Sequence, residues 1–249
     1  MNQGPVNPAG DYVVYWMISA RRLGWTFGLQ RAVDHAVALG KPLVILEALR
    51  CDYPGANDRL HQFILDGMAV NQRHAARSRA LYYPYVEPSL GHGHDFLPTL
   101  AANAAVVVTD WYPAFFLPRM VAAAAARLTV RLEAIDSNGV IPLADHGKAF
   151  TAARFYRAFV QRVLREHVTQ VPEEAPLTRL KKSPQLSSLP RSVTRRWPAA
   201  SARLLTDGVK PLSALPLDHT IPPVAARGGH DAAARALRRF VTAKLSSYD

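Results

Sequence analysis

The sequence predicts an α/β fold in which helices cover both faces of a five-stranded parallel sheet. Two observations predict it. Short apolar segments rich in β-branched and aromatic residues recur between residues 12 and 135, and stretches with helical spacing of apolar residues separate them. The short segments are apolar throughout, without alternating polar residues, which is typical of strands buried on both faces of a parallel sheet.

The first strand, helix and second strand are the clearest of these segments. Tyr12–Ile18 (YVVYWMI) is the first expected strand. A helix is expected over Trp25–Leu39, because its apolar residues recur every three to four positions, and Gly40 ends it. Pro42–Leu49 (PLVILEAL) then returns to a buried strand. This order gives the first strand–helix–strand unit of a parallel sheet.

The same alternation continues to residue 135. Asn57 or Asp58 can cap a helix that runs to about His74, since both side chains accept hydrogen bonds from helical N–H groups. The following elements are expected to be a weaker strand at Ala80–Tyr83, a helix near Phe96–Ala102, a strand at Ala105–Thr109, a helix at Phe116–Ala126 and a strand at Thr129–Ile135. We therefore expect residues 1–149 to form one domain with a Rossmann-like sheet.

The pattern changes after this domain. Residues 150–169 are expected to form a connecting helix, and residues 170–229 an interdomain linker, because they are rich in Pro, Ser and charge, with one helical fragment near Ala199–Leu205. Residues 230–249 are expected to form an isolated amphipathic helix. Such a helix must bury its apolar face, so it either packs back on the first domain or belongs to a further domain.

The charge of the chain is concentrated in its second part. Thirty Lys and Arg against 19 Asp and Glu give a net charge of +11. Residues 1–150 carry 13 basic and 12 acidic residues, and residues 151–249 carry 17 and 7. The excess therefore lies beyond the sheet and indicates an anionic partner such as nucleic acid, with a solvated basic tail as the alternative.

Location is predicted from the cysteine content and the apolar runs. The single cysteine, Cys51, cannot form an internal disulfide and fits a reducing compartment. The first ten residues lack the order of an export signal, and the apolar runs are shorter than a membrane-spanning helix requires. We therefore expect a cytoplasmic protein without membrane contact.

A candidate pocket follows from the strand ends. In parallel sheets, ligands bind beyond the carboxyl ends of the strands, where the strand order reverses. The polar or flexible side chains there are Met17, Arg21, Arg22, Glu47 and Asp110. Their alternative role is to end the strands.

Common catalytic and cofactor motifs are absent from the sequence. Gly91-His92-Gly93-His94 lacks the third glycine of a dinucleotide-binding loop. His92 and His94 lack further zinc-type ligands nearby, so we expect a polar loop and no metal. The sequence also lacks a nucleophile elbow of the hydrolase type.

Several segments, taken together and in order, resemble class II DNA photolyases, which belong to the photolyase/cryptochrome family. The matching segments are Tyr15-Trp16-Met17, Pro42–Leu49, Asp58–Met68, Val106–Asp110, Asp136–Pro142, Leu217-Asp218-His219, Pro222–Val224 and Arg227–Gly229, with the helix that ends at Tyr248. The resemblance covers nearly the whole chain, and it places the end of the chain at the start of the family's helical FAD domain.

The resemblance implies a function and a set of ligands. Photolyases are lyases that split cyclobutane pyrimidine dimers in damaged DNA, using light and reduced FAD. Their α/β domain can hold an antenna chromophore, a deazaflavin or a folate, which here implies a pocket bordered by Met17, Arg21, Arg22, Glu47 and Asp110. Of the flavin contacts, only Tyr248 matches the family, with a frayed terminal aromatic as the alternative. Arg154 and Arg157 are candidates for contacts with the helical domain, with a plain solvated helix face as the alternative.

The resemblance also implies that this chain alone is inactive. The four tryptophans precede the final helix, so they cannot be assigned to an electron path beside a flavin. A separately encoded helical FAD domain is then the expected partner. Two other hypotheses are a freestanding α/β ligand-binding module and a basic nucleic-acid-binding adaptor in which residues 151–249 bind DNA or RNA.

Overall fold

A parallel sheet of five strands forms the centre of the molecule. The computed structural model describes residues 1–143, 147, 149–206 and 212–248. The sheet has the order β3-β2-β1-β4-β5, and every neighbouring pair is parallel. Its strands are β1 (Tyr12–Met17), β2 (Leu43–Leu49), β3 (Leu81–Val86), β4 (Ala104–Trp111) and β5 (Leu132–Asp136). This arrangement confirms the predicted α/β fold, and the order reverses between β1 and β4.

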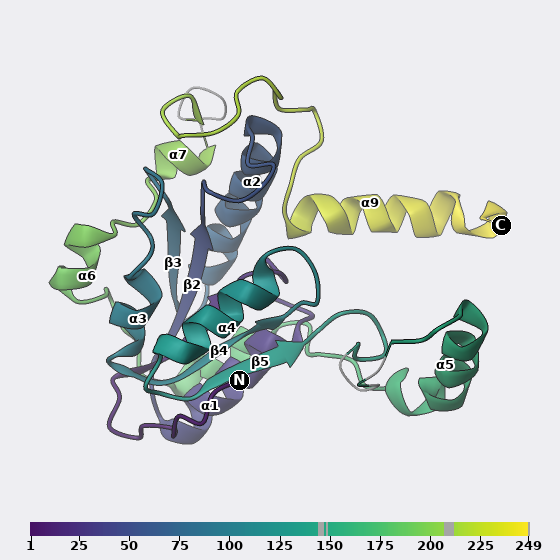
Figure 1. Cartoon of the computed structure of the whole chain (residues 1–249), viewed down its shortest axis with the longest axis horizontal. Helices are drawn as coiled ribbons and strands as arrows, with labels where there is room; N and C mark the ends of the chain where they lie inside the picture. The colour runs from purple at the N-terminus through teal and green to yellow at the C-terminus, as the bar shows by residue number, and fades with distance from the viewer. Residues whose placement is uncertain (144–146, 148, 207–211, 249) are drawn as a thin grey trace.

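Helices cover both faces of the sheet (Figure 1). Helices α1 (Phe27–Leu39) and α2 (Asp58–Ala75) lie on one face, and α3 (Phe96–Ala101) and α4 (Leu117–Arg127) lie on the other. Side chains in a strand alternate between faces, so Tyr15 and Met17 pack toward α1, while Val14 and Trp16 pack toward α3 and α4. The two faces therefore have separate hydrophobic cores.

The expected helix ends are largely correct. The Asn57 side chain accepts a hydrogen bond from the Leu60 N–H at 2.9 Å, so Asn57 caps α2. Gly40 ends α1 with a φ of +61°, in the left-handed region that glycine adopts without steric cost. Strand β3 is longer than expected and runs through Pro84. A proline fits there because β3 is an edge strand and needs no N–H donor on its outer side.

The segment expected to be a linker packs on the sheet domain in several places. It contains η1 (Pro176–Lys182), α6 (Arg191–Arg196) and α7 (Ala202–Thr206), whereas the sequence predicted one helical fragment. Leu180, Trp197 and Leu205 each join a different buried cluster. The Trp197 ring stacks on Phe96 with centroids 5.1 Å apart, and its indole N–H donates to the His92 carbonyl. These isolated apolar anchors fix the segment without helical periodicity.

The sheet topology does not test the expected domain boundaries, which stay predictions. The expected domains include residues 144–146, 148, 207–211 and 249, which lie outside the described part of the chain.

Two amphipathic helices project from the sheet domain (Figure 1). Neither α5 (Ala153–His167) nor α9 (His230–Ala243) contains a buried residue. Helix α9 is held at its start, where His74 Nε2 lies 3.1 Å from Asp231 Oδ1 and Gly229 approaches Gly67. It ends before the expected Tyr248, and Leu245–Ser247 form the short helix η2. None of the helices in the described ranges is long and apolar enough to cross a membrane.

Candidate functional site

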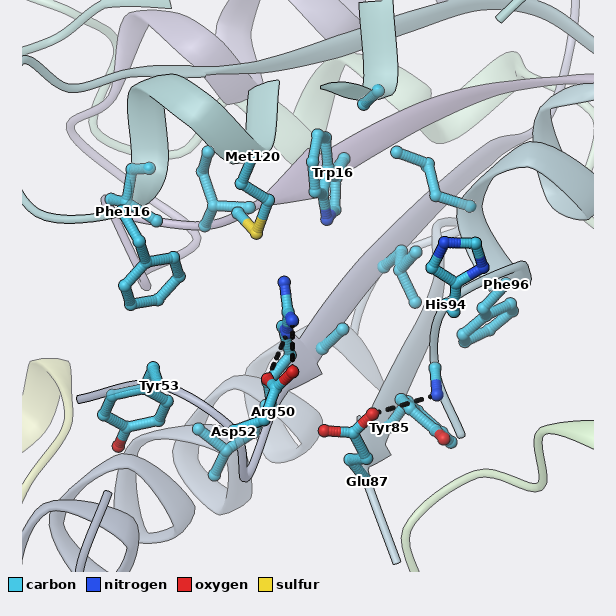
Figure 2. Close-up of a pocket in the computed structure, with 18 of the residues that line it drawn as sticks. Trp16, Arg50, Asp52, Tyr53, Tyr85, Glu87, His94, Phe96, Phe116 and Met120 are labelled. Atoms are coloured by element: carbon cyan, nitrogen blue, oxygen red, sulfur yellow. Dashed lines mark hydrogen bonds and ion pairs between the residues drawn. The ribbon is translucent and has the colours of Figure 1, made fainter. Parts of the chain in front are cut away.

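A cavity of about 460 Å³ lies beyond the carboxyl ends of β1, β2 and β3, on the face covered by α3 and α4 (Figure 2). Its lining is mainly apolar and aromatic. The sheet contributes Trp16, Leu46 and Ala48, helices α3 and α4 contribute Phe96 and Met120, and Phe116 lies in the turn before α4. The volume is in the range of sites for small organic ligands, which are usually concave and mostly apolar.

The local sequence explains why this part of the face is hollow. Ala48 is the small residue among the side chains that β2 directs toward α4. Helix α4 adds Ala123 and Ala124 to the lining, in a run of five alanines. Small side chains on both walls leave a space that larger apolar residues would fill.

Aromatic rings form the mouth of the cavity. The Tyr53 ring lies 5.6 Å from the Phe116 ring in a stacked arrangement. The Phe115 side chain also lines the cavity although 79% of the residue is exposed. Its φ of +61° is in the left-handed region, which costs a residue other than glycine about 1–2 kcal/mol. An exposed, strained phenylalanine at a cavity mouth is a candidate for ligand contact.

The cavity has few polar groups. The Glu87 carboxylate is buried, and it accepts hydrogen bonds from the Gly93 N–H at 3.0 Å and the Cys51 N–H at 2.9 Å. Arg50 and Asp52 form a bidentate ion pair at 2.7 and 2.6 Å. Figure 2 shows both groups among the lining residues. A carboxylate retains further acceptor capacity, so Glu87 can accept a hydrogen bond from an N–H or O–H group of a ligand.

The surroundings of the neighbouring thiol and phenol favour the protonated forms of both groups. Burial, with the charges of Glu87 and Asp52, raises the pKa of Cys51 to about 12. Burial raises the pKa of Tyr53 to about 12, against the opposing effect of the Arg21 charge. Burial also lowers the pKa of His61, whose Nε2 lies 3.1 Å from the Arg50 carbonyl. The raised pKa values disfavour the Cys51 thiolate and the Tyr53 phenolate, which are the nucleophilic forms of these groups.

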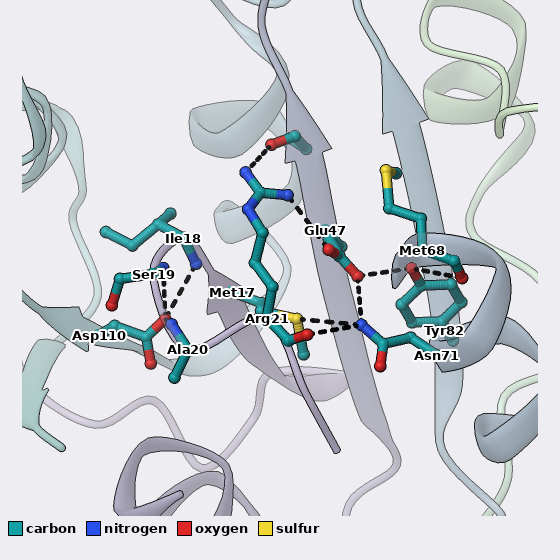
Figure 3. A network of polar contacts seen from close by, with 11 residues as sticks. Met17, Ile18, Ser19, Ala20, Arg21, Glu47, Met68, Asn71, Tyr82 and Asp110 are labelled. Carbon is teal, nitrogen blue, oxygen red and sulfur yellow. Dashed lines mark hydrogen bonds and ion pairs between the residues drawn. The ribbon is translucent and has the colours of Figure 1, made fainter. Parts of the chain in front are cut away.

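Three of the residues proposed from the sequence meet around Asn71 in a network beside the cavity: Met17, Arg21 and Glu47 (Figure 3). Glu47 Oε1 accepts from Arg21 at 3.1 Å, and Glu47 Oε2 accepts from Asn71 at 2.8 Å and from the Tyr82 hydroxyl at 2.6 Å. Arg21 also donates to the Ala48 carbonyl and lines the cavity. Because Glu47 is fully buried and directed toward α2, its charge positions Arg21 at the cavity wall.

The remaining proposed residues, with Met17, face the α1 side of the sheet. Asp110 Oδ1 accepts from the Tyr15 hydroxyl at 2.6 Å, and Oδ2 accepts from the N–H groups of Ile18, Ser19 and Ala20 at 2.8–3.1 Å. Met17 is buried in the α1 core, and its sulfur lies 3.9 Å from the Asn71 amide nitrogen of the Glu47 network. Arg22 donates to the carbonyls of Gly24 and Trp25. Thus Arg21 alone of the five proposed residues lines the large cavity.

Sequence reasoning missed Glu87 and the aromatic lining. Glu87 directly follows β3, which makes it the third acidic or polar group at a strand end after Glu47 and Asp110. That position was an available signal. The aromatic residues gave none, because apolar side chains at strand ends are indistinguishable from core residues before the helices are placed.

The remaining candidates lie apart from the cavity or do not form a metal site. Tyr248 is 73% exposed, and its ring contacts that of Phe240 edge to face. His92 Nδ1 lies 2.8 Å from the Tyr85 hydroxyl, and His94 Nδ1 lies 2.9 Å from Asp95. Across the described residues, no group of three or more His, Cys, Asp or Glu side chains is placed to hold a metal ion.

Comparisons with known proteins identify relatives of this domain. No family model matches the sequence. A deoxyribodipyrimidine photo-lyase of Methanothermobacter thermautotrophicus is 31% identical over 148 residues, which are 59% of this chain and 32% of that protein. The chain is homologous to a photolyase. It spans about a third of the length of that relative.

A solved photolyase shares the fold. A bacterial class III photolyase from Agrobacterium tumefaciens superposes with a TM-score of 0.55 at 14% sequence identity, over 93% of this chain and 45% of the other. At this identity the likeness establishes the fold alone. The five-stranded sheet with its surrounding helices is therefore the fold of the photolyase antenna domain.

Proposed function

We propose that this chain is the α/β part of a class II DNA photolyase and that its cavity binds an antenna chromophore. The complete enzyme would be a cytoplasmic lyase that splits cyclobutane pyrimidine dimers in damaged DNA with light and FAD. The homology to a photolyase supports the enzyme class. The apolar cavity of about 460 Å³ at the carboxyl ends of β1–β3 carries the chromophore assignment.

The cavity residues fit a deazaflavin or a folate. Both ligands have a flat heteroaromatic ring, which can stack on the Tyr53, Phe115 and Phe116 rings. Both also have N–H groups that can donate a hydrogen bond to the buried Glu87 carboxylate. Arg21 and the Arg50–Asp52 pair can bind polar substituents. The bound chromophore would absorb light and transfer the excitation energy.

The residue matched to a flavin contact lies away from both cavities. Neither the cavity of about 460 Å³ nor a second one of about 20 Å³ includes Tyr248 in its lining. Tyr248, the proposed flavin contact, has an exposed side chain and packs on Phe240. A role for Tyr248 beside FAD therefore requires surfaces from a helical FAD domain.

We further propose that the apolar faces of α5 and α9 bind that helical domain, whether it is separately encoded or continuous with this chain. Phe155 is 48% exposed on α5, and Leu237 is 62% exposed on α9. Amphipathic helices are stabilised mainly by burying such faces, which neither helix does in the described structure. Arg154 stacks over Phe155, and Arg157 lies one turn further along α5, so both can flank the contact.

A matched pair of variants tests the chromophore assignment. The purified chain is titrated with an 8-hydroxydeazaflavin and with a methenyl-folate, and binding is followed between 350 and 450 nm. Ala123→Trp should abolish binding, because Ala123 lines the cavity. Ala122→Trp is the control, since this neighbouring residue on α4 is exposed and outside the lining. Absence of binding, or equal binding by both variants, would refute the assignment.

A second experiment separates the three functional hypotheses. The chain is combined with a helical photolyase FAD domain and titrated with intact and dimer-containing duplex DNA. A photolyase prefers damaged DNA and reverses the dimer only in light. A nucleic-acid adaptor would show salt-dependent binding without lesion preference. A ligand-binding module would bind the chromophore but no DNA at physiological salt.

A further inference from the structure

Two stretches of the chain contain no acidic residue. They are residues 67–86 and 175–206, which include the end of α2, strand β3, η1, α6 and α7. Their basic residues are Arg73, Arg77, Arg79, Arg179, Lys181, Lys182, Arg191, Arg195, Arg196 and Arg203. This charge is therefore not limited to the second part of the chain.

The fold joins the two stretches at the amino-terminal edge of the sheet. Arg79 Nε donates a hydrogen bond of 2.7 Å to the Ser183 carbonyl, across 104 residues of sequence. Ala75 and Ala80 share a buried cluster with Leu180. The turn between α2 and β3 is therefore adjacent to the end of η1. This edge is opposite the carboxyl ends of the strands, where the cavity lies.

Four exposed cations meet at this junction, and we call them the basic edge: Arg77, Arg79, Lys181 and Lys182. None of them has a carboxylate partner among the described residues. Neighbouring cations differ, since Arg73 lies 3.8 Å from Asp231 and Arg179 pairs with Asp34 and Glu173. The basic edge therefore has uncompensated charge available for an anion.

The surroundings of the basic edge favour the phosphate backbone of a duplex. Within the described residues of the two acid-free stretches, no large apolar side chain is exposed. Membrane-surface elements place apolar side chains beside their cations, and single-stranded nucleic acid is bound by exposed aromatic rings. A purely cationic edge has neither feature and matches the regularly spaced phosphates of double-stranded nucleic acid.

We propose that the basic edge is a sequence-independent contact for duplex DNA, separate from the chromophore cavity and from any lesion site. The choice of DNA over RNA rests on the proposed photolyase function. Each phosphate contact should steepen the dependence of log K on log salt by about 0.9. Three contacts then add about 2.7 to the slope, or about 40-fold in affinity between 50 and 200 mM salt.

The test compares two triple variants with the same change in charge. Arg77→Ala/Lys181→Ala/Lys182→Ala removes the basic edge but keeps Arg79 and its bond to Ser183. The control, Arg119→Ala/Arg165→Ala/Lys244→Ala, removes exposed cations from α4, α5 and the end of α9. Binding to an undamaged 20-base-pair DNA duplex is measured by fluorescence anisotropy between 50 and 200 mM salt. Circular dichroism checks that each variant is folded.

The basic-edge variant should show a salt slope shallower by about 2.7, whereas the control keeps the slope of the unchanged chain. Equal slopes for the two variants would refute the proposal. Tighter binding to single-stranded DNA, to duplex RNA or to vesicles with 30% anionic lipid would also overturn it. The assay uses neither light, lesion nor chromophore. Its result can therefore be interpreted even if the photolyase proposal fails.

Discussion

Replacing Asp110 with alanine tests whether the polar residues at the strand ends hold the sheet domain together. The Asp110 side chain connects β4 to the end of β1 through four hydrogen bonds. Three backbone N–H groups converge on one of its oxygens, in the manner of a bound anion at the end of a strand. The carboxylate thus occupies a position that could otherwise attract a phosphate.

The expected cost follows from the donors that the substitution leaves without an acceptor. The Tyr15 hydroxyl and the Ile18 N–H are buried, so each loses about 1–3 kcal/mol when unpaired. The N–H groups of Ser19 and Ala20 are partly buried and can bond to water. Removing the carboxylate also ends the cost of burying a charge. The two buried donors together cost about 2–6 kcal/mol, and the relief from burying the charge offsets part of this, so we expect a net loss of about 3 kcal/mol from the free energy of unfolding.

Urea unfolding followed by circular dichroism measures this loss. Asp34→Ala is the control, because Asp34 forms an exposed ion pair with Arg179 that should contribute less than about 1 kcal/mol. In a double-mutant cycle, Tyr15→Phe should cost about 1 kcal/mol in the unchanged chain. Beside Asp110→Ala it should instead restore about 1–3 kcal/mol, because it removes the buried hydroxyl that has lost its acceptor. Equal losses for Asp110→Ala and Asp34→Ala would refute the reasoning.

Three further predictions follow from individual residues. Phe115→Asn should stabilise the chain by about 0.5–1 kcal/mol in thermal unfolding, because asparagine tolerates the positive φ at this position. The same variant should bind the chromophore more weakly. A loss of stability would contradict the expected relief of backbone strain. Burial lowers the pKa of His61, so the unfolded chain binds a proton that the native chain does not, and stability should fall as pH decreases through about 6.5. His61→Gln should reduce that pH dependence in urea titrations, and an unchanged profile would exclude His61 as its source. Burial raises the pKa of Cys51 to about 12, so its reaction with a thiol reagent should be about 1,000-fold slower in the native than in the unfolded chain. Comparable rates in the two states would show that Cys51 is not a buried, protonated thiol.

The elements of the sheet were predictable because their signals are local. Apolar runs mark each strand, and residues such as Asn57 and Gly40 act at their own helix ends. The predicted strand ended at Tyr83, whereas β3 runs to Val86 and includes Pro84, a residue that sequence rules place outside strand interiors. Only the strand order reveals that β3 is an edge strand, where proline is acceptable.

The covering segments were less predictable because their contacts are distant in sequence. The Trp197 ring stacks on Phe96. Its backbone carbonyl accepts a hydrogen bond from the hydroxyl of Tyr83, which is 114 residues away in sequence. Leu180 and Leu205 likewise contribute single side chains to buried clusters. A lone apolar residue in a polar, proline-rich segment has no periodicity that would predict its burial.

The sequence by itself determined the α/β class, the edge of the sheet where a site should lie, and the resemblance to photolyases. Only the tertiary structure decided which face of that edge is hollow. Trp16 and Met17 are neighbours in β1, yet Trp16 lines the cavity and Met17 is buried on the α1 side, because successive side chains of a strand point to opposite faces. Polar residues such as Glu47 and Asp110 mark the correct edge, while the small residues Ala48 and Ala123 leave the space on the other face.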